Sequence, residues 1–389
     1  MHSVRWLYQN DLQVLLDLLV GDGFCVVGPT IQQHAIVYDE IHRIEQLPKG
    51  WTDSQSPAVY QIARTPDGPA QEKLFHFNLG PHSWKKYLFA PESVLPSESS
   101  ASEFPQVGEP AGASVKPFAI LGARACELAA IAIQDRVFMN PPFIDSQYAL
   151  RRKSLFVVAV QCTTAASTCF CPSMNTGPAL PDPQSQPQAF DLSLTELTRS
   201  DLSEAENPAI QKHGFLIQAG SEPGQSILDR LPTVEASPKM LQAREQAIEQ
   251  VTASIQRSMP TNQLRDALMA RLQHPHWEDV AQRCLSCANC TMVCPTCFCS
   301  SVEEVHDLVD QTIIRQRRWD SCFNPDFSHT SGAPVRDSVK SRYRQWLTHK
   351  LATWHDQFET SGCVGCGRCI TWCPVGIDLT QEVARLLES

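Results

Sequence analysis

The amino-acid sequence predicts an α+β protein, in which an N-terminal α/β domain over residues 1–235 precedes a mainly helical domain over residues 236–389. Two observations lead to this prediction. Short runs rich in Val, Ile and Phe occur in the first part of the chain, and long segments with helical periodicity follow residue 239. The stretch 231–239 between them separates regions of different character and is taken as the domain boundary.

The first domain contains four runs with the length and composition of strands. Residues 122–138 begin with a Gly turn and continue as an apolar-periodic helix between the last two of these runs. We expect those two strands to be parallel neighbours. Two stretches rich in Ser, Pro, Gln or Gly, residues 93–115 and 174–188, are predicted to be loops. The four predicted strands are residues 23–28, 35–41, 116–121 and 154–161.

The second domain is predicted to be helical. Ser301 and Glu304 have the spacing of a capping box and would open a helix over residues 301–311. The last long segment carries a stripe of large apolar residues along one face, which we interpret as core packing rather than a cofactor contact. The long helical segments are residues 239–258, 262–273 and 336–358.

Composition excludes several classes of protein. The formal net charge of −10 argues against nucleic acid as a partner, because binding phosphates needs clustered Lys and Arg. The first 23 residues have no uninterrupted apolar core typical of a secretory signal, and no run is long enough to span a membrane. We therefore expect a cytoplasmic protein. Sixteen cysteines in such a chain favour metal ligands over disulfides.

Two cysteine quartets carry the strongest signal. Each has the spacing C-x₂-C-x₂-C-x₃-C followed by Pro, which is the bacterial two-cluster ferredoxin pattern. In that arrangement the fourth cysteine of each quartet binds the other cluster. The expected ligands are therefore Cys284, Cys287, Cys290 and Cys373 for cluster 1, and Cys363, Cys366, Cys369 and Cys294 for cluster 2.

Structural zinc is the alternative for these quartets. A zinc site needs only four thiolates and does not account for two matching quartets that each end in Pro, so we favour two 4Fe–4S clusters. The connection between the quartets is long and predicted to be helical, whereas small ferredoxins use a short hairpin. This favours an α-helical ferredoxin domain.

A third iron–sulfur site is predicted in the first domain. Cys162, Cys169 and Cys171 lie within ten residues, and Cys126 follows a neighbouring predicted strand. The carboxyl edge of a parallel sheet would bring these cysteines together, although Cys25 or Glu127 remain alternatives for the fourth ligand. Ordinary buried cysteines are the competing interpretation. The remaining cysteines of the second domain, Cys297, Cys299 and Cys322, have no clear assignment. Packing near the clusters is the default, and weak S–H···S contacts or ligation of a further group are the alternatives.

These segments also carry a family resemblance. GARACELAAIAIQDRVF, QCTTAASTCFCPSMNTGP, the paired cysteine quartets and WDSCFNPDFS occur in the order found in a known family. The chain resembles the β (iron–sulfur) subunit of cytosolic NAD(P)-linked nickel–iron hydrogenases, or sulfhydrogenases. It is also similar to the A subunit of anaerobic sulfite reductase. It departs from the family in GARACE, which has Ala and Glu where Pro and Asp are more frequent.

The resemblance implies an electron-transfer subunit. The sequence has no G-x-G-x-x-G after a strand, no Walker loop and no nucleophile triad, so we expect that the chain carries electrons and converts no substrate itself. The implied partners are a flavin- and NAD(P)-binding subunit and the small and large subunits of a nickel–iron hydrogenase, or else a sirohaem sulfite reductase subunit. An iron–sulfur redox sensor or assembly scaffold is the less favoured alternative. Arg368, inside the second quartet, is either a modulator of cluster 2 or a surface residue. Residues 80–89 are interpreted as a surface strand, with docking of a partner or lining of the third cluster as alternatives.

Overall fold

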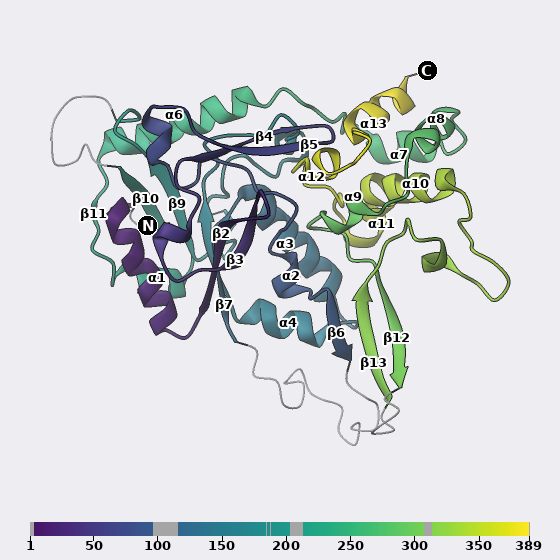
Figure 1. Ribbon diagram of the computed structural model, residues 1–389, viewed down its shortest axis with the longest axis horizontal. Helices are drawn as coiled ribbons and strands as arrows, with labels where there is room; N and C mark the ends of the chain where they lie inside the picture. Colours follow the sequence, from purple (N-terminus) through teal and green to yellow (C-terminus); the bar gives the residue numbers. More distant parts are fainter. Residues whose placement is uncertain are drawn as a thin grey trace.

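The computed structural model describes residues 4–95, 116–183, 185–186, 188–202, 213–306 and 313–388 (Figure 1). Most of the predicted loop 93–115 lies outside these residues. A mixed sheet with the order β11-β1-β10-β9-β8-β7-β2-β3 forms the larger part of the first half. Its strands are β1 Arg5–Tyr8, β2 Cys25–Gln32, β3 Ala35–Glu40, β7 Phe118–Ala123, β8 Leu155–Val160, β9 Leu192–Leu197, β10 Gly214–Ala219 and β11 Val234–Glu235.

The four central strands of this sheet are parallel. β7 pairs with β2 on one side and with β8 on the other, and β8 pairs in parallel with β9. All six residues of β8 are buried, as expected for a strand covered on both faces. The four predicted strands and the parallel pairing of β7 with β8 are confirmed.

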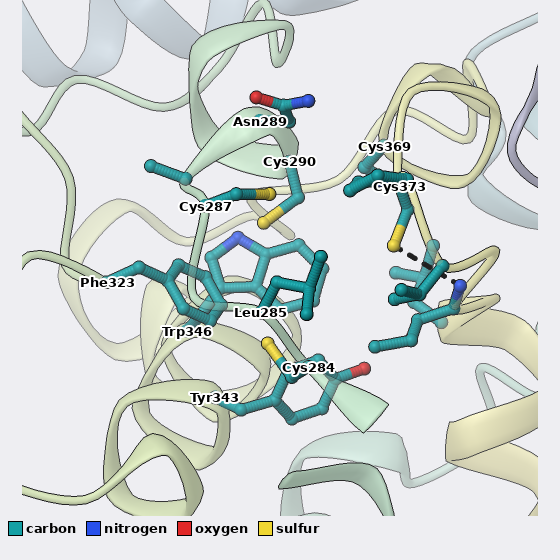
Figure 2. A pocket seen from close by; sticks show the side chains of 15 residues that line it. Cys284, Leu285, Cys287, Asn289, Cys290, Phe323, Tyr343, Trp346, Cys369 and Cys373 are labelled. Carbon is teal, nitrogen blue, oxygen red and sulfur yellow. Dashed lines mark hydrogen bonds between the residues drawn. The ribbon is translucent and has the colours of Figure 1, made fainter. Parts of the chain in front are cut away.

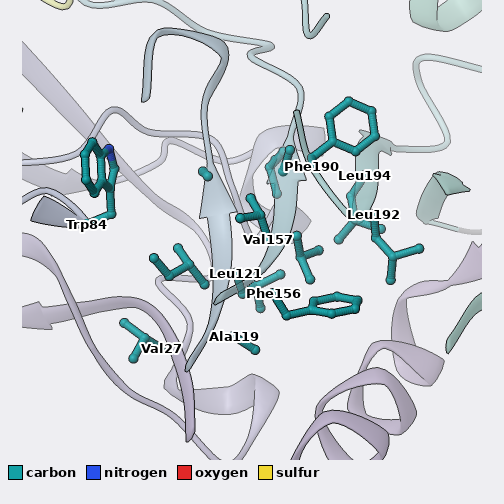
Figure 3. Close-up of a cluster of buried hydrophobic side chains, with 14 of the residues drawn as sticks. Val27, Trp84, Ala119, Leu121, Phe156, Val157, Phe190, Leu192 and Leu194 are labelled. Atoms are coloured by element: carbon teal, nitrogen blue, oxygen red, sulfur yellow. The ribbon is translucent and has the colours of Figure 1, made fainter. Parts of the chain in front are cut away.

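Helices pack on the sheet and enclose the main hydrophobic core. Figure 3 shows part of this core, with Leu121 of β7, Val157 of β8 and Leu192 of β9 on neighbouring strands and the rings of Trp84 and Phe190 on either side of them. The predicted helix after β7 is confirmed as α3. The helices of this half are α1 Leu12–Gly21, α2 Lys85–Leu88, α3 Ala125–Phe138, α4 Ser146–Lys153 and α5 Glu222–Leu228.

The second half is mainly helical. Its first helix, α6 (Pro238–Ser254), packs beside β9 of the first half, and its other helices gather at the opposite end of the molecule from α1 (Figure 1). The predicted apolar stripe lies in a second hydrophobic core, where Tyr343, Leu347 and Leu351 are buried. One turn of π-helix, His349–Thr353, interrupts this segment. The helices are α6 Pro238–Ser254, α7 Leu264–Met269, α8 His276–Arg283, α9 Asn289–Met292, α10 Val339–Thr348, α11 Trp354–Phe358, α12 Arg368–Thr371 and α13 Leu379–Leu387.

The prediction of a helix that begins at Ser301 is wrong. Residues Ser300–His306 form strand β12, which pairs with β13, Ile313–Trp319, and β13 pairs in turn with β6, Glu92–Leu95. The capping-box pattern is a local signal, and strand pairing with distant residues overrides it. The outer part of the predicted helix, residues 307–311, lies outside the described residues. A separate hairpin is formed by β4, Trp51–Ser56, and β5, Val59–Arg64.

The two halves pack against each other through shared contacts. The β6–β13 pairing joins them in one small sheet, visible below the helices in Figure 1. Trp354 and Val364 of the second half belong to the main core, and Phe170 of the first half belongs to the second core. No helix in the described part of the chain is long and apolar enough to cross a membrane.

Candidate iron–sulfur sites

The first site is a cavity lined by Cys284, Cys287, Cys290 and Cys373. Cys284 and Cys287 come from the loop between α8 and α9, Cys290 lies in α9, and Cys373 follows α12. Figure 2 shows these side chains around one space, beside the rings of Tyr343, Trp346 and Phe323. The structure therefore brings together the four residues expected for cluster 1. Cys369, expected in cluster 2, also reaches this cavity.

The two cysteine loops have the same backbone conformation. The second and fourth residues after the first cysteine have left-handed φ angles: 51° at Ser286 and 66° at Ala288 in one loop, and 65° at Gly365 and 73° at Gly367 in the other. This conformation aims a backbone amide at the first thiol. Ser286 N–H donates to Cys284 Sγ over 3.4 Å, and Gly365 N–H donates to Cys363 Sγ over the same distance.

The second site contains Cys294, Cys363, Cys366 and Cys369. Cys369 interacts electrostatically with the other three, although these residues come from segments about seventy positions apart. Burial raises the pKa of Cys363 to about 12. A thiol with such a pKa stays protonated at neutral pH unless a metal displaces its proton. These donors therefore suit a bound cluster better than free thiolates.

Lys350 is a buried cation at the second site. Its Nζ donates to Cys294 Sγ over 3.3 Å, to Thr296 Oγ1 over 3.2 Å and to the Gly362 carbonyl over 3.0 Å. The side chain belongs to the π-helical turn, and the residue is only 3% exposed. The pKa of Cys294 is held well below its usual value, mainly by a hydrogen bond from Cys297 and also by the charge of Lys350. Together these outweigh the effect of burial, which raises the pKa. No pattern in the sequence distinguishes this lysine from a surface lysine.

The model of a known domain family, the 4Fe-4S dicluster domain, matches residues 283–377 and so spans both quartets. Residues 283–377 are a 4Fe-4S dicluster domain. The domain accounts for two 4Fe–4S clusters, as predicted, and sets aside structural zinc at the quartets. Among the described residues, no group of three or more His, Cys, Asp or Glu side chains is arranged to hold a single metal ion.

A curated relative extends the similarity beyond the dicluster domain. The chain is 29% identical over 275 residues to "Sulfhydrogenase 2 subunit beta" of Pyrococcus furiosus, and the match covers 70% of this chain and 74% of the relative. This similarity confirms the resemblance noted from the sequence. No solved structure matches the chain.

Outside the dicluster domain, Cys126, Cys162, Cys169 and Cys171 line a second cavity. Cys126 lies in the first turn of α3, which follows β7, and Cys162 follows β8. The carboxyl ends of two parallel strands therefore supply two of the four thiols, as expected. Burial raises the pKa of Cys169 to about 12. This thiol, like Cys363 at the second site, would therefore lose its proton at neutral pH only on binding a metal.

The alternatives for the fourth position of this third site lie elsewhere. Cys25 begins β2 and pairs with Phe118, at the opposite end of the parallel strands. The carboxylate of Glu127 is engaged by Tyr38 Oη at 2.9 Å and by Arg368 at 2.9 Å. Burial raises the pKa of Cys126 well above its usual value, although Cys126 lies in the first turn of α3.

Two buried guanidinium groups line the third site. Arg124 donates to the carbonyl of Phe75 over 2.8 Å and to that of Gln161 over 3.0 Å. Arg368 is 5% exposed and forms an ion pair with Glu127, so its interpretation as a surface residue is wrong. Positive charge at this cavity favours a bound anion such as a thiolate-ligated cluster.

The loops of the second and third sites touch through their backbones. Phe170 N–H donates to the Gly365 carbonyl over 2.8 Å. A Cβ added to Gly365 would lie 2.6 Å from the backbone of Cys171, and one added to Gly367 would lie 2.3 Å from the Thr168 carbonyl oxygen. Glycine is therefore required at both positions by close approach as well as by φ.

The prediction that residues 80–89 form a surface strand is wrong. They lead into the short helix α2, in which Trp84 is fully buried and Lys85 is 3% exposed. Lys85 Nζ donates to the Cys297 carbonyl over 3.2 Å and lies 3.9 Å from the centre of the Trp319 ring. The sequence placed two lysines between aromatics but could not show which of them turns inward.

Proposed function

We propose that this chain is an electron-transfer subunit of an oxidoreductase complex. One observation carries the proposal: the three cysteine sites adjoin in a row. Cys290 of the first site interacts electrostatically with Cys294 of the second, and Cys366 of the second lies beside Cys126 of the third and lines the third cavity. Iron–sulfur clusters at such sites supply one-electron redox chemistry.

The ligand sets are part of this proposal. Cys284, Cys287, Cys290 and Cys373 would hold cluster 1, and Cys363, Cys366, Cys369 and Cys294 would hold cluster 2. Cys126, Cys162, Cys169 and Cys171 would hold a third cluster. The shared cavities and the electrostatic contacts support these assignments.

The first site is the one nearest to solvent. Cys287 is exposed, and its neighbour Leu285 is 64% exposed, whereas Cys366 and Cys126 are partly buried against the main core. A redox partner would therefore exchange electrons with the row at the loop of Leu285 and Cys287. The N-terminal residues 1–235 would form the α/β domain that holds the third site, and residues 236–389 the helical domain that holds the other two.

The partners are proposed from the relative. A β subunit of a sulfhydrogenase works within a hydrogenase complex, so we infer a flavin/NAD(P)-binding subunit on one side and a nickel–iron hydrogenase module on the other. Within such a complex, this chain's residues position and insulate the clusters, and substrate conversion belongs to the partners. The direction of electron flow is set by the potentials of those partners.

The test is to isolate the native complex through a tag on this chain, under anaerobic conditions, and to determine its metals and cofactors. We expect nickel and flavin to co-purify with the chain in stoichiometric amounts. A complex that contains sirohaem and no nickel would instead assign the chain to a sulfite reductase. Iron-containing chain with no redox partner at all would contradict an electron-transfer role.

A further inference from the structure

A hollow in the surface lies beside the third site and is separate from the cavities that hold the cysteines. Its volume is about 440 Å³. One wall is a face of α3 that carries Ala125, Ala129 and Ala132, and the other wall includes residues 175–177. Ala132 is exposed and Ala129 is half-buried, so the hollow opens to solvent. We refer to this hollow as the α3 groove.

The wall of the α3 groove is thin where it covers the third site. Gly177 lines the groove, and a Cβ added to it would lie 3.4 Å from Cys171 Sγ and 3.1 Å from the Ala125 Cβ. Ala125 also lines the groove, and it directly precedes Cys126 in the sequence. Two of the four cysteines of the third site therefore lie immediately behind residues that have no side chain or only a methyl group.

Hydrogen bonds hold this wall in place. Thr176 N–H donates to the Cys171 carbonyl over 3.2 Å, and Thr176 Oγ1 donates to the Val364 carbonyl over 2.7 Å. The next residues are fixed in the same way, because Gln161 Nε2 donates to the Pro178 carbonyl over 3.0 Å. The groove is therefore preformed, and a molecule bound in it would lie at a fixed distance from the third site.

The lining of the α3 groove favours a protein over a nucleotide cofactor. Among the described residues that line it, the charged ones are Asp135 and Arg152, and these pair with each other at 3.0 Å. The phosphates of a flavin or nicotinamide nucleotide are usually bound by Lys or Arg side chains that are free to pair with them. Small apolar side chains together with the amides of Gln186 and Gln188 instead resemble the core of a protein–protein interface, in which charged residues are depleted.

We propose that the α3 groove is a docking surface for a redox partner subunit, at the end of the cluster row that lies away from Leu285 and Cys287. The occupant is a projecting loop of that subunit with an uncharged, apolar tip, and the partner's one-electron centre lies behind this loop. Gly177 and Ala125 leave room for that centre to come close to the third site. Each transfer oxidises one centre and reduces the other by one electron, and no bond is made or broken.

The inference rests on the proposed function, because it needs a cluster at the third site and a partner that exchanges electrons with it. The first test compares backbone hydrogen exchange in the native complex with exchange in the purified chain alone, both kept anaerobic. We expect residues 175–180 to exchange at least about tenfold more slowly in the complex, because the docked loop covers them. Equal exchange in the two samples would overturn the proposal.

A second test fills the α3 groove with a large side chain. Ala132→Trp should lower the affinity of the chain for one redox partner by about tenfold or more, because overpacking forces the interface apart. Ala253→Trp is the matched control, at an exposed alanine of α6 that is not among the residues of the groove, and it should leave the affinity unchanged. The affinity is measured by native mass spectrometry of the complex on dilution, and the iron content of each variant shows whether its clusters are intact.

An Ala132→Trp chain that keeps its iron and binds both partners with unchanged affinity would overturn the proposal. A small organic molecule released from the purified chain on denaturation, and absent after Ala132→Trp, would also overturn it and assign the groove to a ligand. An iron-containing chain that assembles with no redox partner would contradict the proposed function itself. Partners that assemble without slowing the exchange of residues 175–180 would contradict the docking surface alone.

Discussion

Replacing Lys350 with methionine is expected to lower the reduction potential of the cluster at the second site. Lys350 Nζ lies 3.3 Å from Cys294 Sγ and is enclosed by protein, so solvent ions screen its charge little. Reduction adds an electron to the cluster, and a nearby positive charge stabilises the reduced form. Methionine keeps much of the side-chain volume and removes the charge.

The size of the effect follows from Coulomb's law. The added electron is shared by irons that lie beyond the sulfur, so the effective separation is about 7 Å. With an effective dielectric constant of about 20, the lost attraction is about 2.4 kcal/mol. For a one-electron couple this corresponds to a potential lowered by roughly 100 mV.

The assay is a redox titration of the purified protein followed by electron paramagnetic resonance. Lys350→Arg keeps the charge and should retain most of the potential. Lys340→Met is the matched control, because Lys340 is a lysine of the neighbouring helix α10 whose side chain is 44% exposed and pairs with Glu278. An unchanged or higher potential in Lys350→Met, with the cluster still present, would refute the reasoning.

Three further changes test the third site and its contacts with the dicluster domain. Cys169→Ser should lower iron by about four per chain, as measured by plasma mass spectrometry, whereas Cys25→Ser should not; equal iron in both would leave the third cavity without a cluster. Glu127→Gln leaves a buried guanidinium without its counter-charge and should reduce the free energy of unfolding in urea by about 3–5 kcal/mol, and a loss below about 1 kcal/mol would contradict the importance of that pair. Gly365→Ala would place a methyl group against the backbone of Cys171 at a residue with a left-handed φ angle, so we expect a markedly lower melting temperature. Gly332→Ala is the control, because a methyl group there meets nothing within 4 Å, and it should leave the melting temperature unchanged. Equal melting temperatures for the two variants would contradict the close approach at Gly365.

The features that the sequence predicted well are those encoded by short-range patterns. The spacing of Cys284, Cys287 and Cys290 determines the shape of one loop, so it indicates a cluster without any knowledge of the fold. The four strands and helix α3 carry their own local periodicity. Predicting that Cys126 and Cys162 lie close together required only the rule that neighbouring parallel strands end at the same edge of a sheet.

The features that the sequence did not predict depend on contacts between distant segments. Residues from Ser301 carry a helix-start pattern, yet they are a strand because β13 and β6 lie beside them. Lys85 and Lys350 look like ordinary lysines, and only the folded chain shows that both point at thiols. Arg368 likewise reads as a surface residue until Glu127, more than two hundred positions away, is found next to it.

The close backbone contact at Gly365 and Gly367 bears on the rate of electron transfer between the second and third sites. Electron tunnelling slows steeply as the gap between redox centres widens. In the proposed row of clusters, the gap between the second and third sites is bridged by two stretches of main chain with no side chains between them. A hydrogen bond and close contact between the two backbones, rather than adjustable side-chain packing, then set the distance that an electron must cross. Thermal motion of surrounding side chains would leave that hop nearly unaltered, whereas a single residue inserted into either loop would lengthen it.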